Sequence, residues 1–289
     1  MRVLVTGAAG TVGRLVVEEL LGAGGWDVRV LTRDPERAAL PKGAEVAVGD
    51  LSRPDSLRAA LAGVERMYLF PVAETAREVV ARAKAAGVRR VVVLSSGAVT
   101  GGMDTSFHLP VERAVEDSGL EWTHVRPGEF AMNKVSLWGP SIREERTVRH
   151  PDPTAAWFPV HERDIADIAV TALLHEGHVG AAYTLSGPQL LSLRQQAHAI
   201  ASALGEEIHF EQVTPEEARE LYLRQGGFAA ANAEFLLGFV DYEGRPADPR
   251  AMPDFDPSAL GPQPTARDVT GRPARTFAQW AHDHRDDFR

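Results

Sequence analysis

The strongest constraint on this chain is a glycine-rich turn that joins a short apolar strand to an amphipathic helix. The strand covers residues 2–6, and Gly7, Gly10 and Gly13 lead into an expected helix over residues 11–23. In such a unit the first glycine permits a tight turn, the second lets the backbone approach a pyrophosphate, and the third lets the helix pack against the strand. The helix N-terminus then faces the negative charge. The order of strand, turn and helix therefore predicts a dinucleotide-binding unit.

The end of the next strand bears on which dinucleotide is bound. The expected strand over residues 27–32 is followed by Arg33, at about the position where an NAD-selective site places the acid that holds the ribose 2′-hydroxyl. An arginine there can instead pair with a 2′-phosphate, and Arg37 adds a second positive charge. This pattern favours NADP(H) as the cofactor. In the alternative NAD(H) is bound, both arginines are solvated and Asp34 is the ribose acid.

Strands and helices alternate through the first half of the chain. Expected strands cover residues 2–6, 27–32, 45–48, 65–70, 89–95 and 121–126, and helical patterns lie near residues 11–23, 54–61, 74–86 and 108–118. A further helix near 162–174 leads to a strand near 182–185. Continuous apolar strands of this kind are typical of a parallel sheet covered by helices on both faces. The sequence therefore predicts an α/β fold, a Rossmann-type doubly wound parallel sheet.

The pattern becomes mostly helical after Pro188, with one strand-like stretch near residues 208–213. We therefore expect an NAD(P)-binding Rossmann domain over residues 1–188 and a small, mostly helical C-terminal lobe over residues 189–289. The lobe is expected to pack against the core and to bind substrate. The proline-rich stretch 243–264 predicts an ordered loop or strap, with a mobile linker as the alternative.

Composition narrows the class of partner. The 289 residues carry a formal net charge of −9, which argues against a nucleic-acid groove because phosphate backbones need a basic face. The chain has no cysteine, which excludes disulfides and thiolate catalysis. No apolar run reaches membrane-spanning length, and no secretory peptide fits before the first strand. We expect a soluble, cytoplasmic protein that acts on a small molecule; nothing in the sequence indicates an oligomer.

Several motifs resemble those of the NmrA-like atypical short-chain dehydrogenases. This family includes NADPH-dependent quinone and triphenylmethane dye reductases and a cofactor-sensing transcriptional regulator. The similarity is carried by residues 5–13, 31–35, 49–51, 118–127, 164–167 and 270–273. It spans nearly the whole chain apart from residues 225–264. These motifs specify the fold and the cofactor far better than the substrate.

The resemblance implies where the cofactor lies. An aspartate at the position of Asp50 contacts the adenine amino group in this superfamily; in the alternative, Asp50 or Ser52 caps the helix that begins near Pro54. Pro71 is expected near the nicotinamide-side ribose. The residues expected to bind the cofactor are Gly7, Gly10, Thr11, Val12, Gly13, Arg33, Arg37, Asp50, Leu51, Phe70, Pro71 and Ser95.

The catalytic pattern departs from that of the main branch of the superfamily, which uses a serine and a Tyr-x-x-x-Lys for proton transfer. Ser96 closes the fifth strand, but His108 and Glu112 stand where the tyrosine and lysine are expected. We expect Ser96 to hydrogen-bond the substrate or the nicotinamide ribose. We expect His108 to supply a proton, with Glu112 orienting its ring. In the alternative, Ser96 caps the strand end and His108 packs or caps in the first turn of a helix.

Polar and aromatic residues after the sixth strand are candidates for the substrate site. Phe130, Asn133, Trp138 and Trp157 are expected to line a pocket, with packing in the core as the alternative. His161 and the glutamate after it have no further ligand at suitable spacing, so no metal is expected.

Together these features predict an NADPH-dependent oxidoreductase that reduces a small conjugated or aromatic, quinone-like molecule. The alternative is a regulatory protein of the NmrA type that senses NADP(H) without turnover, because the usual tyrosine and lysine are missing. A non-redox isomerase or dehydratase is a third, weaker possibility.

Overall fold

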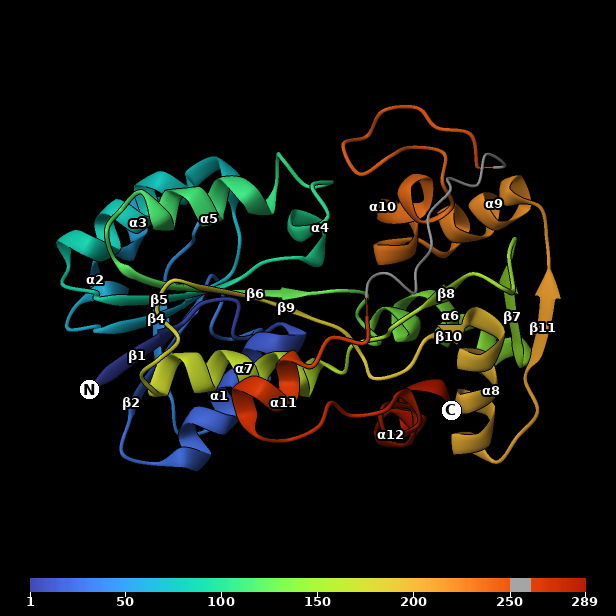
Figure 1. Ribbon diagram of the computed structural model, residues 1–289, viewed down its shortest axis with the longest axis horizontal. Helices are drawn as coiled ribbons and strands as arrows, with labels where there is room; N and C mark the ends of the chain where they lie inside the picture. Colours follow the sequence, from blue (N-terminus) through green and yellow to red (C-terminus); the bar gives the residue numbers. More distant parts are fainter. Residues whose placement is uncertain (250–260) are drawn as a thin grey trace. The chain divides into compact units, whose positions relative to one another are not determined.

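The computed structural model describes residues 1–249 and 261–289, which form two compact units (Figure 1). The first unit comprises Met1–Pro127, Glu162–Leu185 and Thr265–Arg272, and the second comprises Gly128–His161, Ser186–Pro264 and Pro273–Arg289. The predicted division at residue 188 is therefore wrong. The chain passes between the units several times, because segments far apart in the sequence pair within each unit.

A seven-stranded sheet of order β3-β2-β1-β4-β5-β6-β9 forms the centre of the first unit, and every adjacent pair is parallel. The strands are β1 (Arg2–Val5), β2 (Asp27–Thr32), β3 (Glu45–Val48), β4 (Arg66–Leu69), β5 (Arg90–Leu94), β6 (Glu121–Pro127) and β9 (Ala181–Leu185). The predicted Rossmann-type α/β fold is confirmed, and the strands lie close to their predicted bounds. The order reverses at β1, which lies between β2 and β4, and open parallel sheets bind ligands at such a switch point.

Helices cover both faces of this sheet. They are α1 (Thr11–Ala23), η1 (Pro54–Leu57), α2 (Arg58–Leu61), η2 (Ala73–Thr75), α3 (Ala76–Ala85), α4 (Gly97–Thr100), α5 (His108–Glu116), α7 (Glu162–Leu174) and α11 (Thr265–Thr270). In Figure 1, α2, α3 and α5 lie over one face, and α1, α7 and α11 over the other. This layering explains why the central strands are apolar on both sides.

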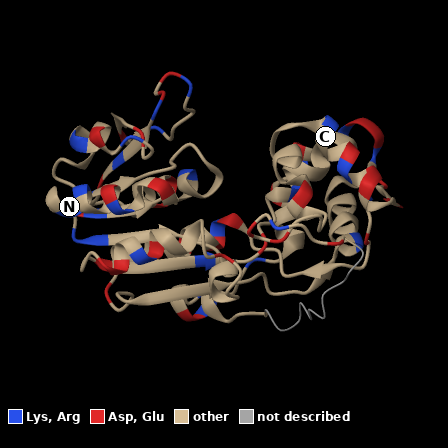
Figure 2. Ribbon diagram, turned by 90° about the horizontal axis from the view of Figure 1, so that it is seen from above, with Lys and Arg blue, Asp and Glu red and all other residues tan. Residues whose placement is uncertain are grey.

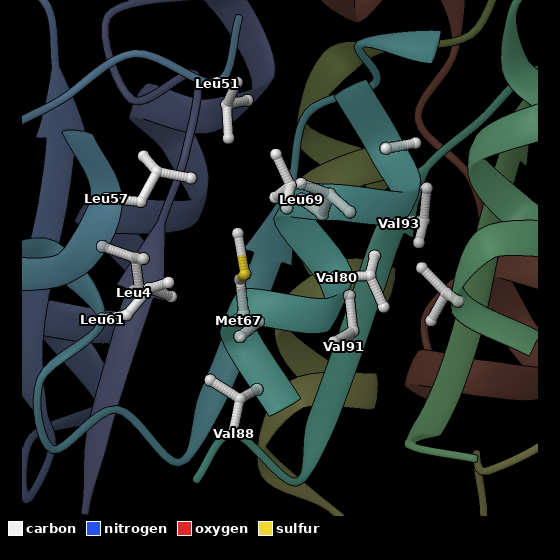
Figure 3. Packing of buried hydrophobic residues seen from close by; sticks show 14 of the residues in the cluster. Leu4, Leu51, Leu57, Leu61, Met67, Leu69, Val80, Val88, Val91 and Val93 are labelled. Carbon is white, nitrogen blue, oxygen red and sulfur yellow. The ribbon is translucent and has the colours of Figure 1, made fainter. Parts of the chain in front are cut away.

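The core beneath α3 fixes the central strands. Leu4, Met67 and Val91 come from three strands and face the helix side, where Val80 of α3 meets them (Figure 3). All four side chains are at most 2% exposed. Burying side chains of this size stabilises a fold by roughly 1.5–3 kcal/mol each. This packing therefore fixes the positions of the strands and of their carboxyl ends.

Two motifs that are distant in the sequence meet on the other face of the sheet. Arg272, just after α11, forms an ion pair with Asp167 of α7 at 2.9 Å. The Thr265 hydroxyl donates a hydrogen bond to the carbonyl oxygen of Thr184 at 2.5 Å. These contacts place residues 265–272 in the first unit.

The second unit is mostly helical. Its elements are α6 (Asn133–Glu145), β7 (Thr147–His150), β8 (Ala156–Trp157), β10 (Leu191–Ser192), α8 (Leu193–Leu204), β11 (His209–Gln212), α9 (Pro215–Gln225), α10 (Gly227–Leu236), α12 (Phe277–Asp283) and η4 (Arg285–Phe288). Strands β7 and β11 are parallel partners, which joins residues 128–161 to residues after 186. The predicted helical C-terminal region is confirmed. Residues 250–260 of the predicted loop 243–264 lie outside the described residues.

Charged residues are distributed over both units. In Figure 2, Lys and Arg alternate with Asp and Glu along the described helices and loops. None of the helices in the described part of the chain combines the length and the apolar character needed to cross a membrane.

Candidate functional site

The glycine turn between β1 and α1 is tight. Gly7 has a φ of +63°, and its carbonyl oxygen accepts a hydrogen bond from the Gly10 N–H at 2.9 Å. A Cβ added at Gly13 would lie 2.2 Å from the same oxygen, so a larger residue there forces the helix away from the turn. A Cβ at Gly10 would meet only this oxygen, at 3.2 Å.

The N-terminus of α1 is open to an anion. Gly10 is its N-cap residue and has no side chain with which to hold the first N–H groups of the helix. Helix N–H groups of the first turn need partners, and the helix dipole favours a negative one. Thr11 and Val12 provide backbone N–H groups there. This turn fits a dinucleotide pyrophosphate, which such turns bind in Rossmann folds.

Phe70 and Pro71 follow β4, on the other side of the switch point. The Phe70 side chain packs over the turn, because a Cβ at Gly7 would lie 3.1 Å from it, and the residue is 43% exposed. Thr6 fixes this loop: its hydroxyl donates to the carbonyl oxygen of Tyr68 at 3.0 Å and accepts from the Phe70 N–H at 2.7 Å. Pro71 itself is buried. The sheet therefore presents an exposed aromatic ring directly beside the glycine turn.

The two arginines after β2 have different surroundings. Arg37 lies 3.8 Å from Asp34 in an exposed ion pair, whereas no hydrogen bond or ion pair engages the exposed Arg33 guanidinium within the described residues. Asp34 also accepts hydrogen bonds from the N–H groups of Glu36 and Arg37, each at 3.2 Å. The Asp34 carboxylate, which could serve as the ribose acid, is therefore hydrogen-bonded to backbone N–H groups of its own loop.

Asp50 is held in a local turn after β3. Its carboxylate accepts a hydrogen bond from the Ser52 N–H at 2.9 Å and lies 3.5 Å from the Arg53 guanidinium. Leu51 is buried in the core. These contacts agree with a structural role for Asp50; contact of Asp50 with adenine stays a prediction.

Ser95 and Ser96 follow β5 directly. Ser95 is buried, and its N–H donates to the carbonyl oxygen of Val125 at 2.7 Å. The Ser96 hydroxyl caps α4 by accepting from the Ala98 N–H at 3.2 Å. Ser96 therefore caps α4, a helix that the sequence patterns did not predict, and not the strand end; its contact with the substrate or the nicotinamide ribose stays a prediction.

His108 begins α5, as expected, but Glu112 does not orient it. The Nδ1 atom of His108 lies 2.5 Å from the carboxylate of Asp104, four residues earlier. Both oxygens of Glu112 instead accept hydrogen bonds from Arg126 of β6, at 2.8 and 2.6 Å. The predicted pairing of Glu112 with His108 is therefore wrong, because an arginine on the next element, β6, offers a bidentate partner.

Asp104 is a residue that the sequence patterns missed. It is 1% exposed, and its carboxylate accepts hydrogen bonds from the N–H groups of Phe107 and His108. Burial opposes its ionisation, but these hydrogen bonds and the His108 ring hold the pKa of Asp104 below its usual range. The signal in the sequence is an aspartate shortly before an expected helix start.

A second ionic cluster, buried except for Glu116, lies further along α5. Glu112, Glu116 and His124 bring potential ligand atoms within 4.8 Å of one another. Burial opposes ionisation of Glu112, but the hydrogen bonds from Arg126 outweigh it and lower the pKa of this carboxyl. Burial also lowers the pKa of His124. Because Arg126 already neutralises Glu112, the cluster suits an internal ion network better than a cation site; the absence of a metal stays a prediction.

The expected substrate residues all belong to the second unit. Phe130 forms a β-bridge with Val160, and Asn133 begins α6. Trp157 is half-buried on β8. Trp138 is 2% exposed, inside the apolar core of this unit, with the Lys134 ammonium 4.8 Å from its ring. Trp138 therefore has the core position that was its alternative; the roles of the other three stay predictions.

Comparison with known proteins places these features in context. A family model described as NAD(P)H-binding matches residues 7–176. The chain is 36% identical to a (4-alkanoyl-5-oxo-2,5-dihydrofuran-3-yl)methyl phosphate reductase of Streptomyces griseus subsp. griseus, with 99% of each chain covered. It is 32% identical to an NAD(P)H azoreductase of Xenophilus azovorans, covering 98% of this chain and 97% of the relative.

A solved structure shows the same fold. The triphenylmethane reductase of a Citrobacter species, complexed with NADP(H), superposes with a TM-score of 0.77 at 20% identity. The superposition covers 98% of this chain and 99% of that one.

Proposed function

This chain belongs to the NAD(P)H-binding family of NmrA-like atypical short-chain dehydrogenases, and we propose that it uses NADPH to reduce a small conjugated organic molecule. The observation that carries the proposal is the uncapped N-terminus of α1 in a turn where Gly13 admits no side chain. Such a turn leaves backbone N–H groups for a pyrophosphate. Two relatives that match over nearly their whole length are reductases by name.

Arg33 supports NADPH as the preferred cofactor, with NADH as a possible second. Its guanidinium is exposed at the end of β2, where a 2′-phosphate would lie, and charge-assisted bonds from arginine suit phosphate. Asp34, the alternative ribose acid, is occupied by the N–H groups of Glu36 and Arg37. Arg37 adds positive charge to the same loop.

The names of the relatives support a conjugated substrate. One describes a ring whose double bond is conjugated with carbonyl groups, and the other describes azo compounds. Both are electron-poor π-systems that accept a hydride. The first unit offers them exposed apolar side chains at or beyond its strand ends, since Phe70, Met103 and Phe107 are each more than 40% exposed.

The nicotinamide, when bound, supplies the hydride. The chain then has to hold the substrate and deliver a proton to the reduced product. We assign the proton to His108, which starts α5 and is 16% exposed at its side chain. Ser96 donates its hydroxyl hydrogen to the substrate or the nicotinamide ribose while accepting from the Ala98 N–H.

A substrate panel tests this function. NADPH oxidation is followed at 340 nm with a benzoquinone, an azo dye, a triphenylmethane dye and an acyl butenolide phosphate. Turnover of at least one compound, faster with NADPH than with NADH, is the expected result. Tight NADPH binding without turnover of any compound would favour the sensing regulator instead.

A further inference from the structure

We propose that Asp104 is a positioning residue that holds the His108 ring with its Nδ1–H on the carboxylate and its Nε2 as the atom that delivers the proton. The inference rests on the proposed reductase function. It adds a residue to the site and states which ring nitrogen acts.

The contacts of Asp104 fix its carboxylate in one orientation. One oxygen accepts hydrogen bonds from the N–H groups of Phe107 at 3.0 Å and of His108 at 3.1 Å. The other oxygen lies 3.0 Å from the same His108 nitrogen and 2.5 Å from Nδ1 of the ring. The Asp104 side chain is completely buried. A carboxylate held in this way accepts a proton-bearing Nδ1, so that Nε2 lies across the ring from Asp104.

The loop before α5 is fixed as well. The N–H groups of Met103 and Asp104 donate to the carbonyl oxygen of Ala98 in α4, at 2.9 and 3.2 Å. The Phe107 ring meets the His108 ring edge-on, with 4.7 Å between centroids and 83° between planes. The imidazole therefore has a defined plane and a defined partner, as an acid catalyst needs.

Other charges around α5 do not replace Asp104. Glu112 lies one turn on, on the same side of the helix, but Arg126 neutralises it through two hydrogen bonds. Arg113 lies about 140° around the helix from His108, at about 100° per residue, and lines a cavity with Arg77 and Glu74. Asp104 is thus a carboxylate in direct contact with the His108 ring.

An Asp104→Asn variant turns this geometry into a test of the ring tautomer. The amide oxygen of asparagine can keep the hydrogen bonds to the two backbone N–H groups. Its NH₂ group then stands where a carboxylate oxygen faced Nδ1, and it can only donate there. The neutral ring must accept at Nδ1 and carry its hydrogen on Nε2, which is the wrong tautomer for the dyad.

The tautomer is measured by ¹⁵N–¹H NMR on the full-length protein without cofactor, at pH 8. His108 of the wild type should carry its hydrogen on Nδ1, and His108 of Asp104→Asn on Nε2. The signal is assigned with His108→Phe. Asp117→Asn is the matched control, because Asp117 is the C-cap residue of α5, is exposed and lies 3.3 Å from the Arg77 guanidinium; it should leave the tautomer unchanged.

Kinetics provide the second readout. Reduction of an azo bond adds a hydride to one nitrogen and a proton to the other, so the product must be protonated. On such a substrate Asp104→Asn should lower kcat about 10- to 100-fold with little change in KM or NADPH affinity.

The outcomes separate the two proposals. An Nε2–H ring in the wild type, or an unchanged tautomer in Asp104→Asn, overturns the positioning role even if the protein reduces the panel. A protein that reduces nothing overturns the proposed function, even if the tautomers are as expected. The wild-type spectrum decides the geometry if Asp104→Asn does not fold.

Discussion

At the scale of single residues, Arg33 and Arg37 show that two nearby arginines can differ in how many of their hydrogen-bond donors remain available to a ligand. Arg37 lies 3.8 Å from Asp34 and shares its charge with that carboxylate. No such partner engages Arg33 within the described residues. The Arg33 guanidinium can therefore direct its donors to a phosphate. Arg33 is the residue to replace in a test of the preference for NADPH over NADH.

Replacing Arg33 by alanine should weaken NADPH binding by roughly 1.5–3 kcal/mol, the range for hydrogen bonds to charged groups, and should barely change NADH binding. Isothermal titration calorimetry measures both affinities. Arg224→Ala removes another exposed arginine, on α9, and should change neither. Equal losses for the two cofactors in Arg33→Ala would show that Arg33 does not read the 2′-phosphate.

His150, at the end of β7, gives the second unit a dependence on pH. Burial, reinforced by the Lys134 ammonium, lowers the pKa of His150 to about 4. The unfolded chain has the ordinary histidine pKa of about 6.5, so it binds the proton more readily between pH 6.5 and 4. The contribution of His150 to stability is therefore complete above pH 6.5 and is lost as the pH falls towards 4.

The free energy of unfolding, measured with urea, should be lower at pH 4 than at pH 7. About 2–3 kcal/mol of this difference should come from His150. In His150→Gln the difference between the two pH values should shrink by that amount. His209→Gln is the matched control, because His209 is exposed on the neighbouring strand β11. If His150→Gln loses as much stability on acidification as the wild type, other groups carry the effect.

At the scale of elements, the turn between β1 and α1 separates two uses of glycine. A Cβ at Gly13 would lie 2.2 Å from the Gly7 carbonyl oxygen, whereas a Cβ at Gly10 would meet that atom at 3.2 Å. Gly10 has an extended backbone that a β-branched residue adopts without strain. The fold thus needs a glycine at position 13, whereas at position 10 we expect the need for glycine to come from the ligand.

Gly10→Val should abolish NADPH binding while the protein stays folded, because its side chain would occupy the path of the pyrophosphate. Gly13→Ala should instead lower the free energy of unfolding by about 1–3 kcal/mol, the cost of overpacking. Gly22→Ala, on the same helix with open space around it, should raise stability by up to about 1 kcal/mol. Circular dichroism and cofactor titration check all three; NADPH binding by Gly10→Val would show that the cradle is misplaced.

The elements also show where sequence patterns suffice and where they fail. The parallel strands follow from continuous apolar runs, but α6 has Gly139 and Pro140 inside it and was not predicted. Proline cannot donate to the carbonyl oxygen of Ser136 one turn earlier. The Gln225 side chain of α9 donates to that oxygen at 2.5 Å, so a residue far along the chain supplies the hydrogen bond that the proline cannot make. The pairings of Asp104 with His108 and of Glu112 with Arg126 could likewise not be predicted from sequence patterns. Which side chains pair depends on where the folded chain places them.

At the scale of the whole molecule, sequence order and spatial order differ. The predicted boundary at residue 188 assumed that each domain is continuous, but β7 pairs with β11, and Arg272 pairs with Asp167. Such pairings leave no local periodicity in a single sequence. The strand, turn and helix of the N-terminal motif are adjacent in the chain, which is why this unit was predictable from the sequence and the domain division was not.

A ligand that binds only the folded chain stabilises it, so the melting temperature of the whole protein reports on the site at the switch point of the sheet. NADPH at about 100 times its Kd should add about 2.7 kcal/mol, which raises the Tm by several degrees for a chain of this size. NADH at the same concentration should raise it less, because it lacks the phosphate that Arg33 would bind. Gly10→Val should show no shift with either cofactor, and Gly22→Ala should show the full shift from its own baseline. Differential scanning calorimetry distinguishes these cases. Equal shifts with NADH and NADPH would contradict the preference for NADPH, and no shift with either would contradict cofactor binding at this turn.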